Sequence, residues 1–400
     1  VVTTVGMETL GWYRYEGTSD SEGIGRELER VAEQLGGTRK WAFNDSPCLD
    51  AEHFKVIADR LIEESGVRPL LHTLVVDAIV KEGKIEGVVV ENKTGRSVIK
   101  AKRVIDCSGD ADVAHHAGCR YTKIPREEAL GVTSVFNVSG VDVERFNEHI
   151  AANPATYADW SRTWNQETTG KEDHLLSPYW DKEFEDAVSS GVIEQPAEHA
   201  SLGGSWSSLT STGEATNLNL VHMNGFDATD TEDLTKAEMQ GRKLTKDAIL
   251  ALRSQVPGFE NIQLRNFSMT LGVRDTRKIL SRHMLSGEDV CHQGRFADAV
   301  GVFPEFVDGY SILILPTTGR YFQIPYGCMV PEVDNLLVAG RCVGGDMIAN
   351  AATRNMMCCT VTGQAAGVAA AVSIKHDQTT MSIDITLVQD ELRRQGARID

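Results

Sequence analysis

One segment, Asn335–Gly367, constrains the fold of this 400-residue chain more than any other. A short apolar run, Leu336–Ala339, leads into a loop that contains three glycines, and a long stretch of helix-forming residues then begins at Asp346. A strand that ends at glycines and turns into a helix presents free N–H groups and the positive end of the helix dipole. The segment could therefore bind an anion or an electron-rich ring, although glycine spacing alone fits an ordinary strand–loop–helix unit equally well.

Composition narrows the classes of partner. The net charge is −17, which argues against nucleic acid and disfavours an anionic membrane surface. We find no apolar run that approaches the 18 or more residues of a membrane span, so we expect no membrane partner. The eight cysteines show neither C-x-x-C nor zinc-finger spacing. They predict a reduced, cytoplasmic protein without disulfides, and we predict no metal site.

The first part of the chain reads as a helix followed by strands. Apolar residues at helical spacing between positions 50 and 64 predict a helix that Asp50 can cap. Three strand-like runs follow, with turn sequences between them, and predict a three-stranded meander. They are Leu70–Val80, Ile85–Glu91 and Ser97–Ala101. A short strand over Arg103–Asp106 then meets a turn of small residues.

The middle of the chain has a different pattern. Strands are expected at Val132–Val138, 216–222 and Ile262–Met269, with a helix that begins after Asp230 and breaks at Pro257-Gly258. Strands mixed with crossover helices suggest a second, α+β domain. Residues 151–210 are polar and irregular, and we interpret them as an insertion that covers the site. This insertion contains four tryptophans: Trp160, Trp164, Trp180 and Trp206.

Four blocks of sequence together resemble the bacterial FAD-dependent oxidoreductases of the glutathione-reductase and fumarate-reductase-like group. They are VIDCSGDADVAHHAG, NGFDATDTEDLTKAEMQGR, LGVRDTRKILSRHMLSGEDV and IPYGCMVPEVDNLLVAGRC, the last continuing into the glycine-rich helix. The resemblance implies an α/β fold, with an FAD-binding Rossmann-like parallel sheet, a β-meander and an inserted α+β substrate domain. It implies an FAD-binding domain over 1–125, a substrate or cap domain over 126–320 and a closing FAD-binding part over 321–400.

FAD is the cofactor that the resemblance implies. The helix Asp346–Cys359 would aim its N-terminus at the pyrimidine edge of the flavin, and the residues near Thr3 would border the isoalloxazine ring. Val75 could hold the adenine, although a β-branched residue in a strand needs no such reason. The candidate cofactor-binding residues are Thr3, Thr4, Gly6, Val75, Ser108, Gly109, Asp110, Gly340, Arg341, Gly344, Gly345, Asp346 and Gly363.

Substrate contacts are expected from the second domain. Arg274 and Arg277 would share one face of a helix, and an arginine pair suits a carboxylate. The alternative for either arginine is a surface ion pair. His222 is a candidate base or hydrogen-bond donor, while His283 and Tyr321 could each orient a substrate or be structural. The segment Phe306–Tyr310 departs from the family, since relatives tend to carry a histidine there.

These observations lead to two functional hypotheses. The first is an FAD-dependent dehydrogenase or desaturase that transfers a hydride from a small organic substrate to flavin N5. No G-x-G-x-x-G motif occurs in the 400 residues, and we expect about 45 residues of a dinucleotide-binding unit to be missing before Val1. The second hypothesis is therefore a flavin-free binding protein or an inactive remnant. The sequence leaves open whether the chain forms homo-oligomers.

Overall fold

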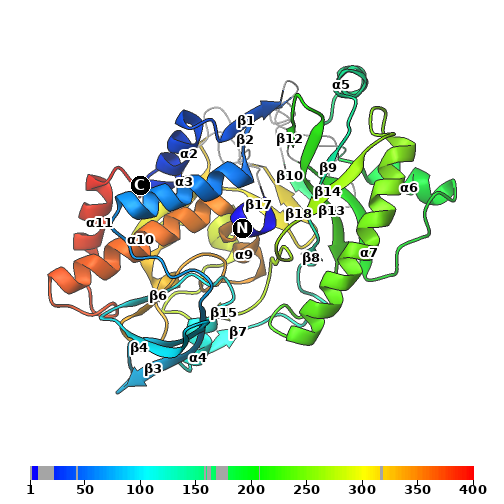
Figure 1. The fold of residues 1–400 in the computed structure, drawn as a ribbon. Coiled ribbons are helices and arrows are strands. Elements are labelled where there is room, and N and C mark those ends of the chain that lie inside the picture. Colours follow the sequence, from blue (N-terminus) through cyan, green and yellow to red (C-terminus); the bar gives the residue numbers. More distant parts are fainter. Residues whose placement is uncertain are drawn as a thin grey trace. The chain divides into compact units, whose positions relative to one another are not determined.

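The structure is a computed structural model that divides the chain into two compact units. It describes residues 2–7, 22–41, 44–156, 159, 164–167, 179–206, 208–315 and 319–400. Unit 1 contains the described residues of 1–12, 31–58 and 125–275, and unit 2 those of 13–30, 59–124 and 276–400. Both units mix helices with small sheets, which confirms the predicted α/β character (Figure 1). The boundaries at 124/125 and 275/276 differ from the expected 125/126 and 320/321, and residues 31–58 group with the middle of the chain.

A buried parallel strand pair lies in unit 2. Strand β6 (Val104–Asp106) pairs in parallel with β20 (Leu336–Val338), which is fully buried. Among the named strands of the described residues, this pair is the parallel one, and the other pairs are antiparallel. The wide parallel sheet that the resemblance implied is therefore represented there by two strands.

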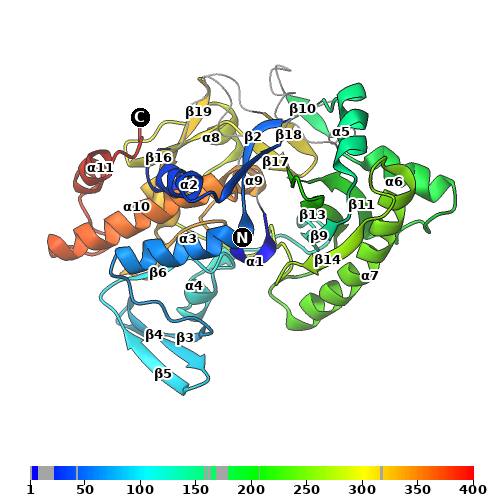
Figure 2. The same ribbon diagram turned by 45° about the horizontal axis from the view of Figure 1, so that its top comes forward.

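The predicted meander is present in unit 2. Strands β3 (Leu74–Lys81), β4 (Lys84–Asn92) and β5 (Gly95–Lys100) form an antiparallel sheet in chain order (Figure 2). The turn after β3 uses Glu82 and Gly83, both at positive φ, as that turn sequence favours. The strand β3 begins four residues later than expected, because residues 70–73 remain outside the sheet.

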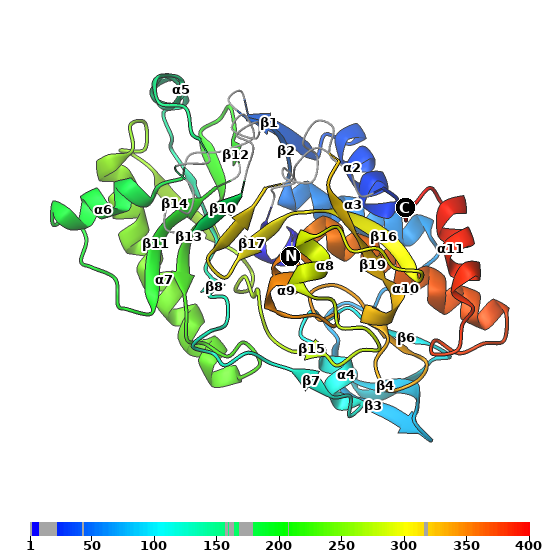
Figure 3. The same cartoon turned by 180° about the vertical axis from the view of Figure 1, so that it is seen from behind.

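Unit 2 also contains antiparallel strand pairs and helices, several of which are labelled in Figure 3. The antiparallel pairs are β7 (Tyr121–Thr122) with β15 (Lys278–Ile279), β16 (Ala299–Pro304) with β19 (Tyr321–Pro325), and β17 (Val307–Gly309) with β18 (Ile312–Ile314). The helices are α4 (Asp112–His116), α8 (Gly287–Cys291), α9 (Met347–Thr353), α10 (Met356–Lys375) and α11 (Ile385–Arg394), with the 3₁₀ turn η4 (Tyr326–Met329). Helices α2 (Ile24–Gln34) and α3 (Ala51–Glu64) each contain a unit boundary.

The segment predicted as one long helix after Asp346 is two helices in the structure. Helix α9 ends at Thr353 and α10 begins at Met356. The side chain of Asn355 donates to the carbonyls of Ala351 and Ala352 at 3.1 and 2.8 Å, and so replaces the helical partners that those carbonyls would otherwise have. A polar side chain that competes for backbone groups thus ends the first helix.

Helix α10 also corrects the expectation that the chain has no apolar run long enough to span a membrane. By length and composition it could cross a bilayer, which the sequence inspection missed. More than half of the apolar window is buried within the protein, as is usual for a core helix, so this property is weak evidence for a membrane span. Its close neighbour is β16, where a side chain at Gly301 would collide with Val361.

Unit 1 is built around an antiparallel sheet. Its strand order is β11 (Ala200–Ser205), β13 (Glu214–Met223), β9 (Phe136–Ser139) and β14 (Gln263–Phe267), and β8 (Val132–Thr133) and β12 (Ser208–Leu209) also pair with β13. Unit 1 also contains three longer helices, which are α5 (Val143–Ala152), α6 (Asp181–Ser189) and α7 (Thr231–Gln255). The short helix α1 (Val2–Val5), the pair β1 (Thr38–Trp41) and β2 (Asn44–Leu49), and β10 (Asn165–Glu167) complete the described elements.

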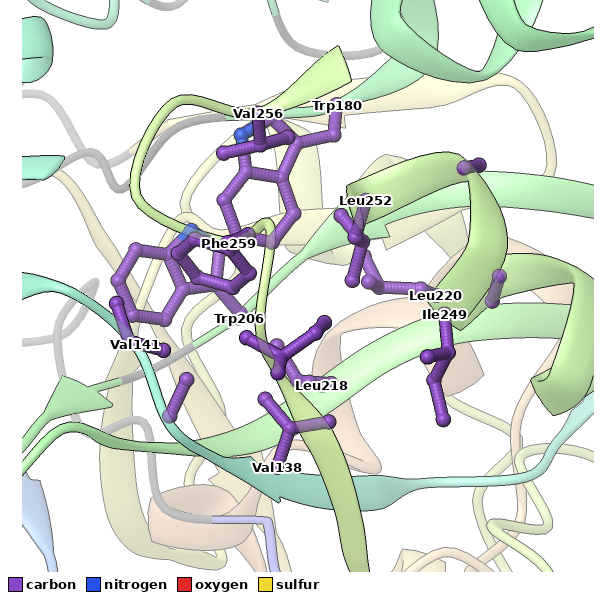
Figure 4. Packing of buried hydrophobic residues seen from close by; sticks show 14 of the residues in the cluster. Val138, Val141, Trp180, Trp206, Leu218, Leu220, Ile249, Leu252, Val256 and Phe259 are labelled. Atoms are coloured by element: carbon purple, nitrogen blue, oxygen red, sulfur yellow. The ribbon is translucent and has the colours of Figure 1, made fainter. Parts of the chain in front are cut away.

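The core of unit 1 contains an aromatic cluster. The indoles of Trp180 and Trp206 are stacked with centroids 5.2 Å apart, and Phe259 meets Trp180 edge-on at 5.3 Å. Figure 4 shows these rings next to Leu252 and Val256. Both tryptophans are 2% exposed and belong to the core of unit 1, and the covering role of residues 151–210 stays a prediction. Trp160 lies outside the described residues, and Trp164 is partly buried.

We predict that Phe259→Ala destabilises the protein by about 3–5 kcal/mol, because it removes a fully buried ring and leaves a cavity among the tryptophans. Urea unfolding followed by tryptophan fluorescence measures this loss. Met239→Ala on α7 is the control, since that side chain is 57% exposed and should change stability by about 0.5 kcal/mol or less. Equal stabilities of the two variants would contradict the assignment of the aromatic cluster as the core.

Candidate functional site

The carboxyl ends of β6 and β20 form the centre of the candidate site in unit 2. The carboxylate of Asp106, the last residue of β6, is 1% exposed. It accepts hydrogen bonds from the backbone N–H groups of Ser108 and Ala114, both at 2.9 Å. Its own carbonyl accepts from the N–H of Ala339, just after β20. The buried carboxylate therefore fixes the turn after β6, and the strand pairing places the two following loops side by side. Ligands commonly bind at this end of parallel strands.

An ion pair joins these two loops. Arg341, after β20, donates from Nη2 to Oδ1 of Asp110 at 2.5 Å, and the same oxygen accepts from Thr276 at 2.7 Å. Arg277 donates from Nη1 to the Asp110 carbonyl and to the carboxylate of Asp112 at 3.0 and 2.9 Å. The predicted residues Ser108, Asp110 and Arg341 thus lie in one hydrogen-bonded network, and Gly109 lies against the Arg341 guanidinium.

The glycines of these loops have two different roles. A side chain at Gly109, which has φ +84°, would collide with the Arg341 guanidinium, and one at Gly344 would collide with Ser281. At Gly345 it would lie 3.0 Å from the carbonyl oxygen of Leu285. We predicted close approach of a cofactor at these positions, and the protein's own packing already requires each glycine.

Gly340 and Gly363 behave differently. Gly340 has φ +88°, and its N–H donates to Thr362 at 3.0 Å, while the nearest atom to a side chain there would be the Cys359 sulfur at 3.9 Å. No described residue comes within 4 Å of a side chain at Gly363. Gly363, a predicted cofactor-binding residue, therefore has open space beside it in the described part of the chain.

The N-terminus of α9 offers less to a ligand than we expected. Asp346 caps it, with Oδ1 accepting from the N–H of Ala349 at 2.8 Å and Oδ2 from that of Gly287 at 2.8 Å. Seven residues make a short helix, and a carboxylate at its start offsets the positive end of the dipole. The predicted N-cap is therefore confirmed, whereas the dipole gives little reason for a ring to bind there.

Between Arg341 and Arg354, three buried side-chain donors lack a hydrogen-bond partner among the described residues. They are Nε of Arg341, Nδ2 of Asn350 and Nε of Arg354. An unpaired buried donor is costly, and a ligand with acceptor oxygens, such as FAD, would satisfy it. The residues at this end of the strands therefore fit an FAD site. Sequence inspection missed Asn350 and Arg354, although two polar residues one helical turn apart among alanines were a signal for them.

The predicted residues Thr3, Thr4 and Gly6 lie in unit 1. The carbonyl of Thr4 accepts from the N–H of Met269 at 2.8 Å, which ties this segment to the end of β14. Gly6 has φ +72° and no described atom within 4 Å of a side-chain position. Val75, in unit 2, lies opposite Val90 in the meander.

His222 and Arg274 come together in unit 1. The guanidinium of Arg274 donates to the carbonyl of Gly131 at 2.9 Å and to Oδ1 of Asn219 at 3.3 Å, and Nε2 of His222 lies 3.0 Å from the Asn219 carbonyl. Burial, followed by the charge of Arg274, lowers the pKa of His222 from 6.5 to about 3. His222 is thus neutral near pH 7, which suits a hydrogen-bond donor better than a base.

The structure separates the predicted arginine pair. Arg274 and Arg277 lie on an extended segment, not on a helix, and they belong to different units. Arg277 donates to the turn after β6 and lies over the ring of Tyr121, so its role is to hold that turn. The expectation that the two arginines share a helical face was therefore wrong, because the chain has no helical structure between β14 and β15.

His283 and Tyr321 lie in unit 2 among packing contacts. The ring of His283 meets that of Phe296 edge-on at 4.9 Å, and the backbone N–H of His283 donates to the carbonyl of Gly327, while the buried Nε2 has no hydrogen-bond partner among the described residues. The ring of Tyr321 is covered by the guanidinium groups of Arg295 and Arg398 at 4.0 and 4.8 Å. These surroundings favour the structural alternative for both residues.

Cysteines and metal ligands add no further chemistry to the site. All eight cysteines lie among the described residues and are free thiols there. Burial raises the pKa of Cys359 to about 11, and that of Cys358 is raised as well, which disfavours a reactive pair. Across the described ranges there is no group of three His, Cys, Asp or Glu side chains that could hold a metal, and the absence of a metal remains a prediction.

A family model described as FAD dependent oxidoreductase matches residues 2–392 of the chain. No curated protein matches the chain. Among solved structures, a geranylgeranyl bacteriochlorophyll reductase-like protein from Thermoplasma acidophilum is 12% identical, with 90% of this chain and 63% of that chain covered and a TM-score of 0.42. The chain thus spans less than two thirds of that protein.

Two halogenating enzymes are also similar. A flavin-dependent brominase is 10% identical, covering 97% of this chain and 73% of its own, with a TM-score of 0.40. The myxobacterial chondrochloren halogenase, described as an FAD-dependent halogenase variant, is 10% identical, covering 95% and 70%, with a TM-score of 0.43. At such scores these likenesses carry no argument about activity.

We predict that Arg341→Met destabilises the protein by about 1–2 kcal/mol, because it removes the charged partner of Asp110. Arg341→Lys should lose less, since it keeps the charge but not the planar fork. Urea unfolding of both variants tests the order. A Met variant as stable as the wild type would show that the ion pair does not hold the two loops together.

We predict that His222 makes stability depend on pH. Its pKa is 6.5 in the unfolded chain and about 3 in the folded protein, so the unfolded state binds the proton first as the pH falls. Stability is complete above the upper value and falls toward the lower one, by about 1.4 kcal/mol per pH unit. His222→Gln should remove this contribution. Identical pH profiles of unfolding for the two proteins would contradict the lowered pKa.

Proposed function

Because the chain belongs to the FAD dependent oxidoreductase family, whose cofactor is FAD, we propose that it is a dehydrogenase or desaturase of a small organic molecule. In this reaction a substrate carbon would give a hydride to flavin N5, and a neighbouring substrate atom would release a proton to solvent. The bound FAD supplies the two-electron acceptor. The observation that carries the proposal is the family match over residues 2–392, which includes both units.

The cofactor-side residues would come from the carboxyl ends of β6 and β20. The Arg341–Asp110 pair holds the two loops together, and Gly340 presents a left-handed turn that has space beside it. The buried donors of Arg341, Asn350 and Arg354 supply hydrogen bonds without a further cost of reorganisation. Asp346 fixes the loop by its two backbone contacts, and Thr3, Thr4, Gly6 and Val75 remain proposed flavin neighbours.

The substrate-side residues would be His222 and Arg274, which Asn219 holds in place. His222 keeps its proton on Nε2, where it faces the Asn219 carbonyl, and its low pKa keeps it neutral. Because this proton is donated to the Asn219 carbonyl, His222 would hold Asn219 beside Arg274 and would not remove the substrate proton. The Arg274 guanidinium, held by Gly131 and Asn219, would favour a substrate that carries negative charge.

Dehydrogenation needs an electron acceptor for turnover, and the sequence has no motif for a second dinucleotide. We therefore propose that the reducing equivalents leave to an acceptor other than NAD(P)⁺. The proposal takes most FAD-binding residues from unit 2, and His222 and Arg274 from unit 1.

We predict that the protein, expressed with any upstream residues of its reading frame, purifies with bound FAD and the absorbance bands of an oxidised flavin. Anaerobic addition of candidate substrates should bleach these bands when the right one is added, with an anionic small molecule reacting best. Arg274→Met should weaken the apparent affinity of that substrate about tenfold or more, as the loss of a charged hydrogen bond implies. A folded protein that binds no FAD would favour the flavin-free binding protein or inactive remnant.

A further inference from the structure

Asn350 is a buried amide with no hydrogen bond to its side chain. The residue lies in the middle of α9 and is 2% exposed. Its backbone makes the ordinary helical bonds, with Asp346 before it and Arg354 after it. The side-chain Nδ2 is buried and has no partner among the described residues. Proteins rarely keep such a group, because a buried unpaired amide costs free energy that an aliphatic side chain of the same size would not.

Arg354 repeats this arrangement one turn along the helix. Residues four apart share a helical face, so Arg354 lies on the side of Asn350. Its Nη2 donates to the backbone carbonyl of Asp308 on β17, and its Nε is buried without a partner in the described structure. Two unpaired donors, one within α9 and one at its C-cap, indicate an acceptor that the polypeptide does not provide.

The position of α9 indicates what that acceptor is. The helix directly follows the loop that leaves the carboxyl end of β20, where Gly340 has its positive φ. Arg341, in the same loop, has the third unpaired donor. A cofactor that binds beyond the carboxyl ends of parallel strands would reach this loop first, and FAD carries carbonyl oxygens that accept such hydrogen bonds.

We propose that Asn350 is a flavin-positioning residue, whose carboxamide donates a hydrogen bond to a carbonyl oxygen of bound FAD. Arg354 supports it from the next turn and is itself held by Asp308. This inference rests on the proposed FAD site and adds to it a side chain that recognises the cofactor. Because the donor is already ordered and buried, it stabilises the bound flavin without further loss of side-chain freedom.

The test is Asn350→Leu, which keeps the approximate volume and removes the unpaired amide. If Asn350 binds FAD, this variant should melt at a higher temperature than the wild type when both lack flavin. Its dissociation constant for FAD should rise about five- to tenfold, as the loss of one hydrogen bond implies. The flavin absorption bands and the midpoint potential of the bound cofactor should also shift, and a purely structural residue would leave both unchanged.

Asn335→Gly is the matched control. Asn335 lies at the other end of β20 and also has a buried side-chain atom without a partner, Oδ1. Its φ of +64° suits glycine, so the fold should tolerate the change, and its FAD affinity, spectrum and potential should match those of the wild type. Asn350→Asp is the second variant if the leucine variant does not fold, because it keeps the shape and removes the donor.

The outcomes distinguish a failure of the proposed function from a failure of the role proposed for Asn350. Wild-type protein that binds no FAD overturns the proposed function. Wild-type protein that binds FAD, together with an Asn350→Leu variant of equal affinity, spectrum and potential, overturns the role of Asn350 alone and assigns the amide to an internal water. Loss of affinity in Asn335→Gly equal to that in Asn350→Leu would also overturn it, because the effect would then be a general one on β20.

Discussion

The ion pair between Arg341 and Asp110 is the interaction on which the candidate site depends. It joins the loops that follow two parallel strands, which are separated in the sequence by more than two hundred residues. Backbone pairing of β6 with β20 sets the distance between the loops, and the ion pair then fixes their direction. The buried carboxylate of Asp106 also fixes the turn after β6 by accepting two backbone hydrogen bonds. The loops are therefore ordered before a ligand binds, which reduces the loss of conformational entropy on binding.

The same network also gives a different reason for the glycines in these loops. Glycine-rich loops are commonly interpreted as space for a cofactor, yet Gly109 makes room for Arg341 and Gly344 makes room for Ser281. The space that a glycine leaves can be filled by another side chain of the protein as well as by a ligand. In this site the stronger indication of a ligand is the opposite feature, a polar side chain such as Asn350 that is buried without a partner.

Unit 1 combines a dense apolar interior with a polar cluster on β13. Leu218 and Leu220 join the aromatic core, while Asn219 and His222 interact with Arg274 or with one another. Neighbouring residues of one strand thus serve stability and chemistry. The rigid core keeps the polar residues in place, and the low pKa of His222 follows from that burial and from the neighbouring positive charge.

The sequence by itself determined the family, FAD as the cofactor, the meander and the Asp346 cap, because these depend on local patterns or on long stretches of similar sequence. Only the tertiary structure decided that Trp180 and Trp206 form a core and that Arg274 and Arg277 separate. It also revealed the unpaired amide of Asn350. The reason is physical: burial, ion pairing and the lack of a partner are properties of neighbours in space, and a sequence gives only neighbours along the chain.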